Sequence, residues 1–413
     1  MIYAQVAYAP RTVTPINASA AKLIGMMMNH RGGKRILMWT ACLAHFLICG
    51  IVFSVSSGAS GQKNFAERWN PTRVPPGVTF VGDKVCAECH EGKAASQARS
   101  SMGMAMESIK DSKILTEHQK LAFRNGPYSY EITRKGDQSF YAVTDGKETI
   151  SLPILFAFGQ GKAGQTYVLQ YDGAYYESLV SFYNETKGLD FTIGQTRDVP
   201  ASLLGALGRR LSKSETLSCF GCHATGAVSG SSLHLDKLTL GVKCEACHGP
   251  GGGHVAAGKA GEPNAKLIFN PARLGGDELT QDFCAACHRG AGEFASLKGM
   301  GVNNVRFQPY RIFNSKCYSD DRRISCAACH DPHEPLNADA AYFDSKCMAC
   351  HAAGGNTARA AAKPNAQASA PACRVETKNC ASCHMPKVEL TGAHFKFTDH
   401  YIRVVRPNEP YQN

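Results

Sequence analysis

The residues of this chain most able to do chemistry are cysteines and histidines in seven short motifs. The 413-residue sequence contains 18 cysteines, and 14 of them form seven pairs, with two residues between the cysteines and a histidine directly after the second. Two thiols at this spacing can form thioethers to the vinyl groups of a haem, while the adjacent imidazole reaches the iron from one face. The motifs therefore predict seven covalently bound haem c groups. The cysteines are Cys86, Cys89, Cys219, Cys222, Cys244, Cys247, Cys284, Cys287, Cys326, Cys329, Cys347, Cys350, Cys380 and Cys383, and the iron-binding histidines are His90, His223, His248, His288, His330, His351 and His384.

Zinc and disulfide bonds are the alternative uses of such cysteine pairs. A zinc site needs four ligands, usually from two pairs, and places no demand on the residue after the second cysteine. A disulfide framework suits an exported chain but leaves the seven histidines without a role. The odd number of pairs, all followed by histidine, favours haem. Two cysteines outside the motifs, Cys317 and Cys373, are expected to form one disulfide in an oxidising compartment.

Haem iron in an electron carrier usually has six ligands, so seven haems need seven more axial ligands. Six histidines lie outside the motifs and the leader, which nearly matches this demand. Met102 is predicted as the remaining ligand, on the first haem, where it would raise the reduction potential. The alternative for this methionine-rich stretch, residues 100–108, which is expected to be helix-like, is ordinary core packing. The six histidines are His118, His234, His254, His333, His394 and His400.

Residues 1–61 are predicted to be a leader. Its apolar run, residues 36–55, follows three basic residues and ends in small residues, which is the layout of a signal peptide. A run of 20 apolar residues is also long enough to span a bilayer. Cleavage and retention as a membrane anchor both remain open. Either way, the rest of the chain is expected to be exported to the periplasm, to the outer face of the cytoplasmic membrane or to the cell exterior.

The net charge of +11 does not indicate a nucleic-acid partner. The leader holds five basic residues and no acidic one, so the remainder has 40 basic against 34 acidic residues. Each haem would add two carboxylates, which brings the holoprotein close to neutral. The expected partners are other redox proteins, and the sequence does not indicate the oligomeric state.

The spacing of the motifs divides the exported part. The first cysteines of motifs one and two are 133 residues apart, whereas later intervals span 21 to 42 residues. The long interval contains alternating apolar and polar runs with Asn-Gly, Asp-Gly and Lys-Gly turns, which predicts antiparallel strands. We expect a mostly α and irregular, haem-packed protein with a small antiparallel β-subdomain inserted between the first two motifs. Its regions are the leader, a first haem-binding segment (62–122), the β-rich insertion (123–195), a six-haem region (196–405), which contains a flexible loop (352–372), and a tail (406–413).

The order of the motifs and their neighbours resembles a known family. The chain is similar to bacterial multihaem cytochromes related to the tetrahaem cytochrome partner of hydroxylamine oxidoreductase. This resemblance implies stacked haem pairs in a helical, loop-rich scaffold. Relatives often have a histidine in a Ser-x-His segment after the first motif, where this chain has Met102. Many also carry a C-terminal tetratricopeptide region, and this chain is expected to be without it. The residues concerned are Cys219-Phe-Gly-Cys-His-Ala-Thr, Cys244-Glu-Ala-Cys-His-Gly-Pro-Gly-Gly-Gly-His254, Asn270-Pro-Ala-Arg-Leu, Cys326-Ala-Ala-Cys-His-Asp-Pro-His333, Cys380-Ala-Ser-Cys-His-Met-Pro-Lys and Phe397-Thr-Asp-His400.

The sequence favours an electron carrier over an enzyme. The predicted role is to pass electrons between a membrane or periplasmic donor and a periplasmic or extracellular acceptor. The alternative is a multihaem reductase of a small nitrogen or sulfur oxyanion, which needs one haem with an open position for substrate. Candidate ligands suffice for every haem, and this count favours the carrier.

Overall fold

The computed structural model describes residues 68–294, 301–320, 324–351, 373, 375–406 and 408–412. Clustering of contacts divides the chain into residues 1–60 and 61–413, so every described residue lies in the second unit. The apolar run 36–55 and the predicted loop 352–372 lie outside the described residues. No helix within the described ranges has both the length and the apolar character needed to cross a membrane.

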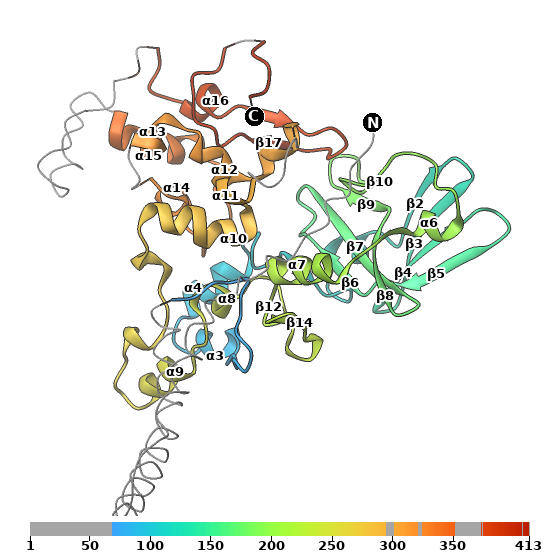
Figure 1. Cartoon of the computed structure of the whole chain (residues 1–413), viewed down its shortest axis with the longest axis horizontal. Helices are drawn as coiled ribbons and strands as arrows, with labels where there is room; N and C mark the ends of the chain where they lie inside the picture. Colours follow the sequence, from blue (N-terminus) through green and yellow to red (C-terminus); the bar gives the residue numbers. More distant parts are fainter. Residues whose placement is uncertain are drawn as a thin grey trace, which may run out of the picture. The chain divides into compact units, whose positions relative to one another are not determined.

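A four-stranded antiparallel meander follows the first motif (Figure 1, teal to green). Alternate side chains of its second and third strands are buried, because successive residues of a strand point to opposite faces. Tyr130 lies opposite Val143, and Ile132 lies opposite Tyr141, all on the buried face. Gly126 and Gly136 turn the chain between strands with positive φ angles of 58° and 61°. The strands are β2 (Lys120–Asn125), β3 (Tyr128–Lys135), β4 (Gln138–Thr144) and β5 (Thr149–Pro153).

A second antiparallel sheet has seven strands in the order β1-β6-β7-β8-β11, with β9 paired to both β7 and β10. Asp172 and Gly173, with φ angles of 47° and 71°, form the tight turn between β7 and β8, as the Asp-Gly sequence predicts. The strands are β1 (Met106–Glu107), β6 (Phe156–Phe158), β7 (Gly164–Tyr171), β8 (Ala174–Ser178), β9 (Val180–Tyr183), β10 (Gly188–Phe191) and β11 (Gly208–Arg210).

One hydrophobic core joins the two sheets. Tyr130 and Tyr141 of the meander, Tyr167 and Phe182 of the seven-stranded sheet, and Leu115 of a short helix are all at most 1% exposed. The antiparallel strands expected from the sequence are therefore present, and they form a core of their own that contains no motif residue among its buried members.

Short helices and small hairpins make up most of the remaining described chain. The helices before motif four are α3 (Asp83–Ala87), α4 (Glu91–Ala98), α5 (Lys113–Glu117), α6 (Leu203–Leu207), α7 (Lys213–His223), η1 (Leu235–Lys237), α8 (Cys244–His248), α9 (Gly252–Lys259), η2 (Ala265–Leu267) and η3 (Pro271–Arg273). The later ones are η4 (Glu278–Cys284), α10 (Ala285–His288), α11 (Ala291–Phe294), η5 (Gly301–Arg306), α12 (Gln308–Phe313), α13 (Lys316–Asp320), α14 (Cys326–Cys329), α15 (Ala340–His351) and α16 (Cys380–His384). Three hairpins pair β12 (Ala224–Thr225) with β15 (Thr239–Leu240), β13 (Val228–Ser229) with β14 (Ser232–Leu233), and β16 (Lys387–Glu389) with β17 (Lys396–Thr398).

Two sequence-based expectations differ from the structure. The methionine-rich stretch 100–108 is not helical, since α4 ends at Ala98 and turns lead into β1. Met106 packs there against Phe220 in a buried apolar cluster and pairs with Phe158 across the sheet, so packing has overridden helix propensity. The expected disulfide is not formed, since Cys317 in α13 and the exposed Cys373 are both free.

Candidate haem-binding sites

Each of the seven motifs contributes residues to a short helix. In such a helix, residues three and four positions apart share one face. Where one helix contains a whole motif, as α7, α8, α15 and α16 do, the two cysteines and the histidine therefore point to the same side, where a haem edge and its iron must lie. The helices are α3 for motif one, α7 for two, α8 for three, η4 with α10 for four, α14 for five, α15 for six and α16 for seven.

Three motif histidines lie opposite three of the spare histidines. Two imidazoles that bind one iron from opposite faces, each with about 2 Å between nitrogen and metal, have ring centres about 6 Å apart. The ring centres of His90 and His254 are 6.2 Å apart with the planes 13° from parallel. Those of His248 and His333 are 6.0 Å apart at 16°. Those of His330 and His400 are 6.2 Å apart at 41°. All three pairs have the separation that a bis-histidine haem requires.

Hydrogen bonds hold these imidazoles in the form that binds metal. A ligating histidine usually donates its second ring N–H to a carbonyl or carboxylate, which orients the ring. Within a pair, Nδ1 of His248 lies 3.0 Å from the Phe269 carbonyl oxygen. The same atom bonds a carbonyl or carboxylate oxygen in other motif and spare histidines, and this arrangement leaves Nε2 for iron. These contacts join His223 to Ala105, His254 to Asn264, His333 to the Asp331 carboxylate, His384 to Arg403 and His400 to Thr398, at 2.9 to 3.1 Å.

Burial favours neutral imidazole at these positions. Desolvation lowers the pKa of His400 to about 4, and it lowers the pKa of His223, His248, His288 and His330 below the ordinary value. A neutral ring is the form that coordinates a metal.

Two buried arginines have N–H groups that fit the carboxylates of haem. Within the described part of the chain, Nη1 of Arg311 and Nε of Arg306 are buried without a hydrogen-bond partner. A buried donor left unpaired is costly, so such groups usually have an acceptor in the working protein. Each haem brings two propionates, which are suitable acceptors. These donors fit the charge of haems near motifs four and five, and the pair of His330 and His400 fits the coordination of the haem on motif five.

The other four predicted ligands have different surroundings. His118 packs its ring against Phe182 of the β core, at 4.9 Å between ring centres. His394 lies with its Nε2 2.6 Å from the Asp190 carboxylate, so this nitrogen is already engaged. Burial would raise the pKa of Asp190, but the hydrogen bond with His394 and the charge of Arg197 lower it below its ordinary value. His234 precedes η1, and Met102 lies in the turn before β1. Within the described residues, no motif histidine packs its ring against His118, His234 or His394. Ligation by these three histidines and by Met102 stays a prediction.

The motifs themselves lie close together in a defined order. Cysteines of different motifs are in side-chain contact, and the helices that carry them pack accordingly. Motif four has contacts on two sides, with motif two through Cys287 and with motif five through Cys284. Cys284 and Cys247 of motif three also pack against the same apolar cluster. The contacting pairs are Cys86 with Cys244, Cys222 with Cys287, Cys284 with Cys326, and Cys347 with Cys380.

Two carboxylates that the sequence did not single out connect neighbouring motifs. Glu245, inside motif three, is 2% exposed and accepts backbone N–H bonds from Val81 at 3.0 Å and Gly82 at 2.7 Å, just before α3 of motif one. It also accepts the N–H of Gly251 at 2.9 Å. Asp344 of motif six's helix likewise accepts the N–H groups of Asn379 and Cys380, at 2.7 and 2.8 Å, at the start of α16.

The Asp344 contact predicts a pH-dependent stability. The N–H groups of Cys380 and Asn379 lower the pKa of Asp344 from its ordinary 3.8. A carboxylate with a depressed folded-state pKa stabilises the fold above its unfolded pKa, and this contribution is lost as the pH falls through the folded value. We therefore expect Asp344→Asn to lower the thermal midpoint at neutral pH but not in strong acid. Thermal melts of both proteins across this range test the idea, and an equal difference at about pH 2 and about pH 7 would contradict it.

Covalent attachment motifs, paired imidazoles and buried arginine donors together define a c-type cytochrome. Comparisons with known proteins agree with this class. A family model described as cytochrome c554 and c-prime matches residues 203–249, and one described as cytochrome c3 matches residues 318–392.

Two curated proteins are similar to parts of the chain. Cytochrome c-554 of Nitrosomonas europaea is 38% identical over 79 residues, which is 17% of this chain and 34% of that protein. The multihaem cytochrome MtrA of Shewanella baltica is 24% identical over 187 residues, 43% of this chain and 47% of that protein. The chain thus matches less than half the length of either relative. The outer cell wall cytochrome OcwA superposes over 79% of this chain and 80% of its own, with 15% identity and a TM-score of 0.41. The family models and the two relatives show that the chain is a multihaem c-type cytochrome.

Proposed function

We propose that this protein is a seven-haem electron carrier in which bis-histidine ligation predominates. The observation that carries the proposal is the set of three imidazole pairs: His90 with His254, His248 with His333, and His330 with His400. A six-coordinate iron has no position for a substrate, whereas it can accept and release an electron with little change in geometry. Haem c, when bound, supplies that one-electron chemistry.

The chain's own residues would perform three tasks. Motif cysteines would fix each haem covalently, and the paired imidazoles would hold its iron from both sides. Backbone carbonyls such as that of Phe269, together with the Asp331 carboxylate, orient the rings through Nδ1. The buried N–H groups of Arg306 and Arg311 would bind propionates, which places positive charge beside negative charge inside the protein.

The contacts between motifs support a connected series of attachment sites. Motifs one and three, three and four, four and five, and six and seven each share a thiol contact or an apolar cluster. The helices α14 and α15 of motifs five and six also pack together. Motif two joins this series at motif four. A series with several neighbouring sites is what transfer between separate donors and acceptors needs.

The relatives support the same role and location. Cytochrome c-554 and the multihaem cytochrome MtrA are both cytochromes, and multihaem c-type cytochromes of this kind are generally exported. We place the protein in the periplasm or at the outer face of the cytoplasmic membrane, with redox proteins as its partners. The match of residues 203–249 to the cytochrome c554 and c-prime model supports the proposed kinship with the tetrahaem family.

The decisive experiment combines haem content and electron paramagnetic resonance of the oxidised holoprotein. We expect seven haems per chain by pyridine haemochrome assay, with low-spin signals dominant and no change on adding nitrite or hydroxylamine. A high-spin population that binds either ligand would replace this proposal with the reductase alternative. Fewer than seven haems would show that some motifs are not used.

A further inference from the structure

The segment after motif seven reaches two different haem sites within four residues. His400 lies opposite His330 of motif five, with 6.2 Å between ring centres. Three residues later, the carbonyl oxygen of Arg403 accepts the Nδ1–H of His384 of motif seven at 2.9 Å, and the Arg403 N–H donates to the His384 carbonyl at 3.2 Å. The position of residues 399–403 therefore sets the orientation of one proposed distal ligand and one proposed motif ligand.

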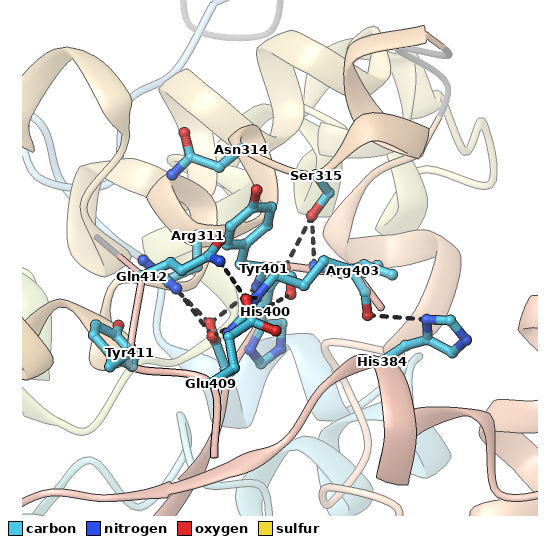
Figure 2. A network of polar contacts seen from close by, with 12 residues as sticks. Arg311, Asn314, Ser315, His384, His400, Tyr401, Arg403, Glu409, Tyr411 and Gln412 are labelled. Atoms are coloured by element: carbon cyan, nitrogen blue, oxygen red, sulfur yellow. Dashed lines mark hydrogen bonds and ion pairs between the residues drawn. The ribbon is translucent and has the colours of Figure 1, made fainter. Parts of the chain in front are cut away.

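A buried charge cluster holds this segment. The Asp399 carboxylate, which is fully buried, accepts Nε and Nη2 of Arg311 at 2.8 and 2.9 Å in a bidentate ion pair. It also accepts Nη1 of Arg403 at 2.9 Å and the backbone N–H of Tyr401 at 3.0 Å. Figure 2 labels Arg311, Tyr401 and Arg403 of this network and shows a dashed contact from His384 to the Arg403 segment.

Neighbouring groups fix Arg311 and the backbone from both sides. The guanidinium of Arg311 lies over the rings of Tyr411 and Tyr401, at 4.7 and 5.4 Å from their centres. Ser315, which follows the helix α12 that carries Arg311, donates its hydroxyl to the His400 carbonyl at 3.2 Å and accepts the Ile402 N–H at 2.8 Å. The segment is thus bound on both flanks of His400 by residues from one stretch of chain (Figure 2).

Such a cluster is better explained by positioning than by stability. Removing charges from water costs so much that a buried ion pair often adds little net stability compared with apolar packing. What a bidentate arginine and carboxylate pair does provide is a defined geometry, because the planar fork matches the two oxygens. Groups that support a metal's ligands commonly work in this way.

We propose that Arg311, Asp399 and Arg403 form a positioning site that aligns His400 on the haem of motif five and His384 on the haem of motif seven. This inference rests on the proposed ligation of those haems. A change in this cluster would then affect both haem sites, although Arg311, Asp399 and Arg403 themselves bind neither iron.

Two variants of the full holoprotein test the proposal. Asp399→Asn keeps the side-chain shape but removes the charge, whereas Arg311→Lys keeps the charge but removes the fork. We expect both variants to produce a high-spin signal of up to one haem in seven, which returns to low spin on adding imidazole. Both should also shift the low-spin signal and the midpoint potential of a second haem. Asp137→Asn is the matched control, because it breaks an exposed pair with Lys110 (70% and 66% exposed) and should change nothing.

The outcomes separate this inference from the proposed ligation. His400→Ala is expected to give the full one-in-seven high-spin signal; if it does not, the proposed ligation of motif five is wrong. If His400→Ala behaves as expected but Arg311→Lys has the wild-type spectrum and potentials, the positioning site is wrong. If Asp399→Asn shifts a midpoint potential and Arg311→Lys does not, the cluster acts only through its charge. The positioning site is then also wrong. Loss of all seven haems in Arg311→Lys would overturn it as well, because a positioning role is local to two haems.

Discussion

We expect His254→Ala and His333→Ala each to convert one haem in seven from low spin to high spin. Each variant removes the ring opposite a motif histidine, His90 or His248, and leaves that iron with a free axial position. Alanine leaves room for an exogenous ligand, so added imidazole should restore the low-spin signal. Electron paramagnetic resonance of the oxidised proteins, integrated against total haem, measures the effect.

The double variant and one matched histidine complete this test. The two substitutions should add to two haems in seven, because they concern different irons. His394→Ala tests the predicted ligation by His394, whose Nε2 contacts Asp190 in this structure. A high-spin signal would confirm that residue as a ligand, and an unchanged spin state would show that it is not one. Unchanged spectra in the other two variants would mean that different side chains serve motifs one and three.

The second large effect is expected at Glu245. Replacing it by alanine leaves three backbone N–H groups, of Val81, Gly82 and Gly251, without their carboxylate acceptor. Hydrogen bonds to a buried charged group contribute about 1.5 to 3 kcal/mol each, so we expect a loss of about 3 kcal/mol or more in the free energy of unfolding. Denaturant unfolding followed by circular dichroism measures this loss.

Motif one supplies a matched control for Glu245. Glu88 is also a glutamate between the two cysteines of its motif, but its carboxylate forms an exposed pair with Lys259 at 3.1 Å. Such pairs contribute about 0 to 1 kcal/mol, so Glu88→Ala should be nearly neutral. Glu245→Gln, which keeps an acceptor oxygen, should fall between the two. Equal losses at both glutamates would show that Glu245 does not connect motifs one and three.

Sequence patterns predicted the structure well where it depends on residues close together in the chain. The Asn-Gly and Asp-Gly turns and the alternation of buried side chains in β3 and β4 follow from the conformations that those residues allow. The helix-like conformation predicted for residues 100–108 is wrong, because a tertiary contact of Met106 with Phe220 determines the conformation of this stretch. The expected pairing of Cys317 with Cys373 failed because matching two leftover cysteines carries no information on distance.

The partners of the spare histidines could not be read from the sequence. His333 lies three residues after His330 in the chain, yet its ring faces His248, 85 residues earlier. His254, close to motif three, faces His90 of motif one. Proximity along the chain misleads here because a ligand must approach the iron from the face opposite its motif, and a neighbouring motif supplies the chain on that side.

The seven attachment motifs were thus determined by the sequence alone, because covalent attachment and the first ligand need residues at most four positions apart. The class of protein follows from them. Only the tertiary structure decided which histidines face each other, that motif four lies between motifs two and five, and that Glu245 and Asp399 hold distant segments in place. The physical reason is that these arrangements depend on contacts between segments tens to hundreds of residues apart, whose side chains have no fixed spacing for a local pattern to reveal.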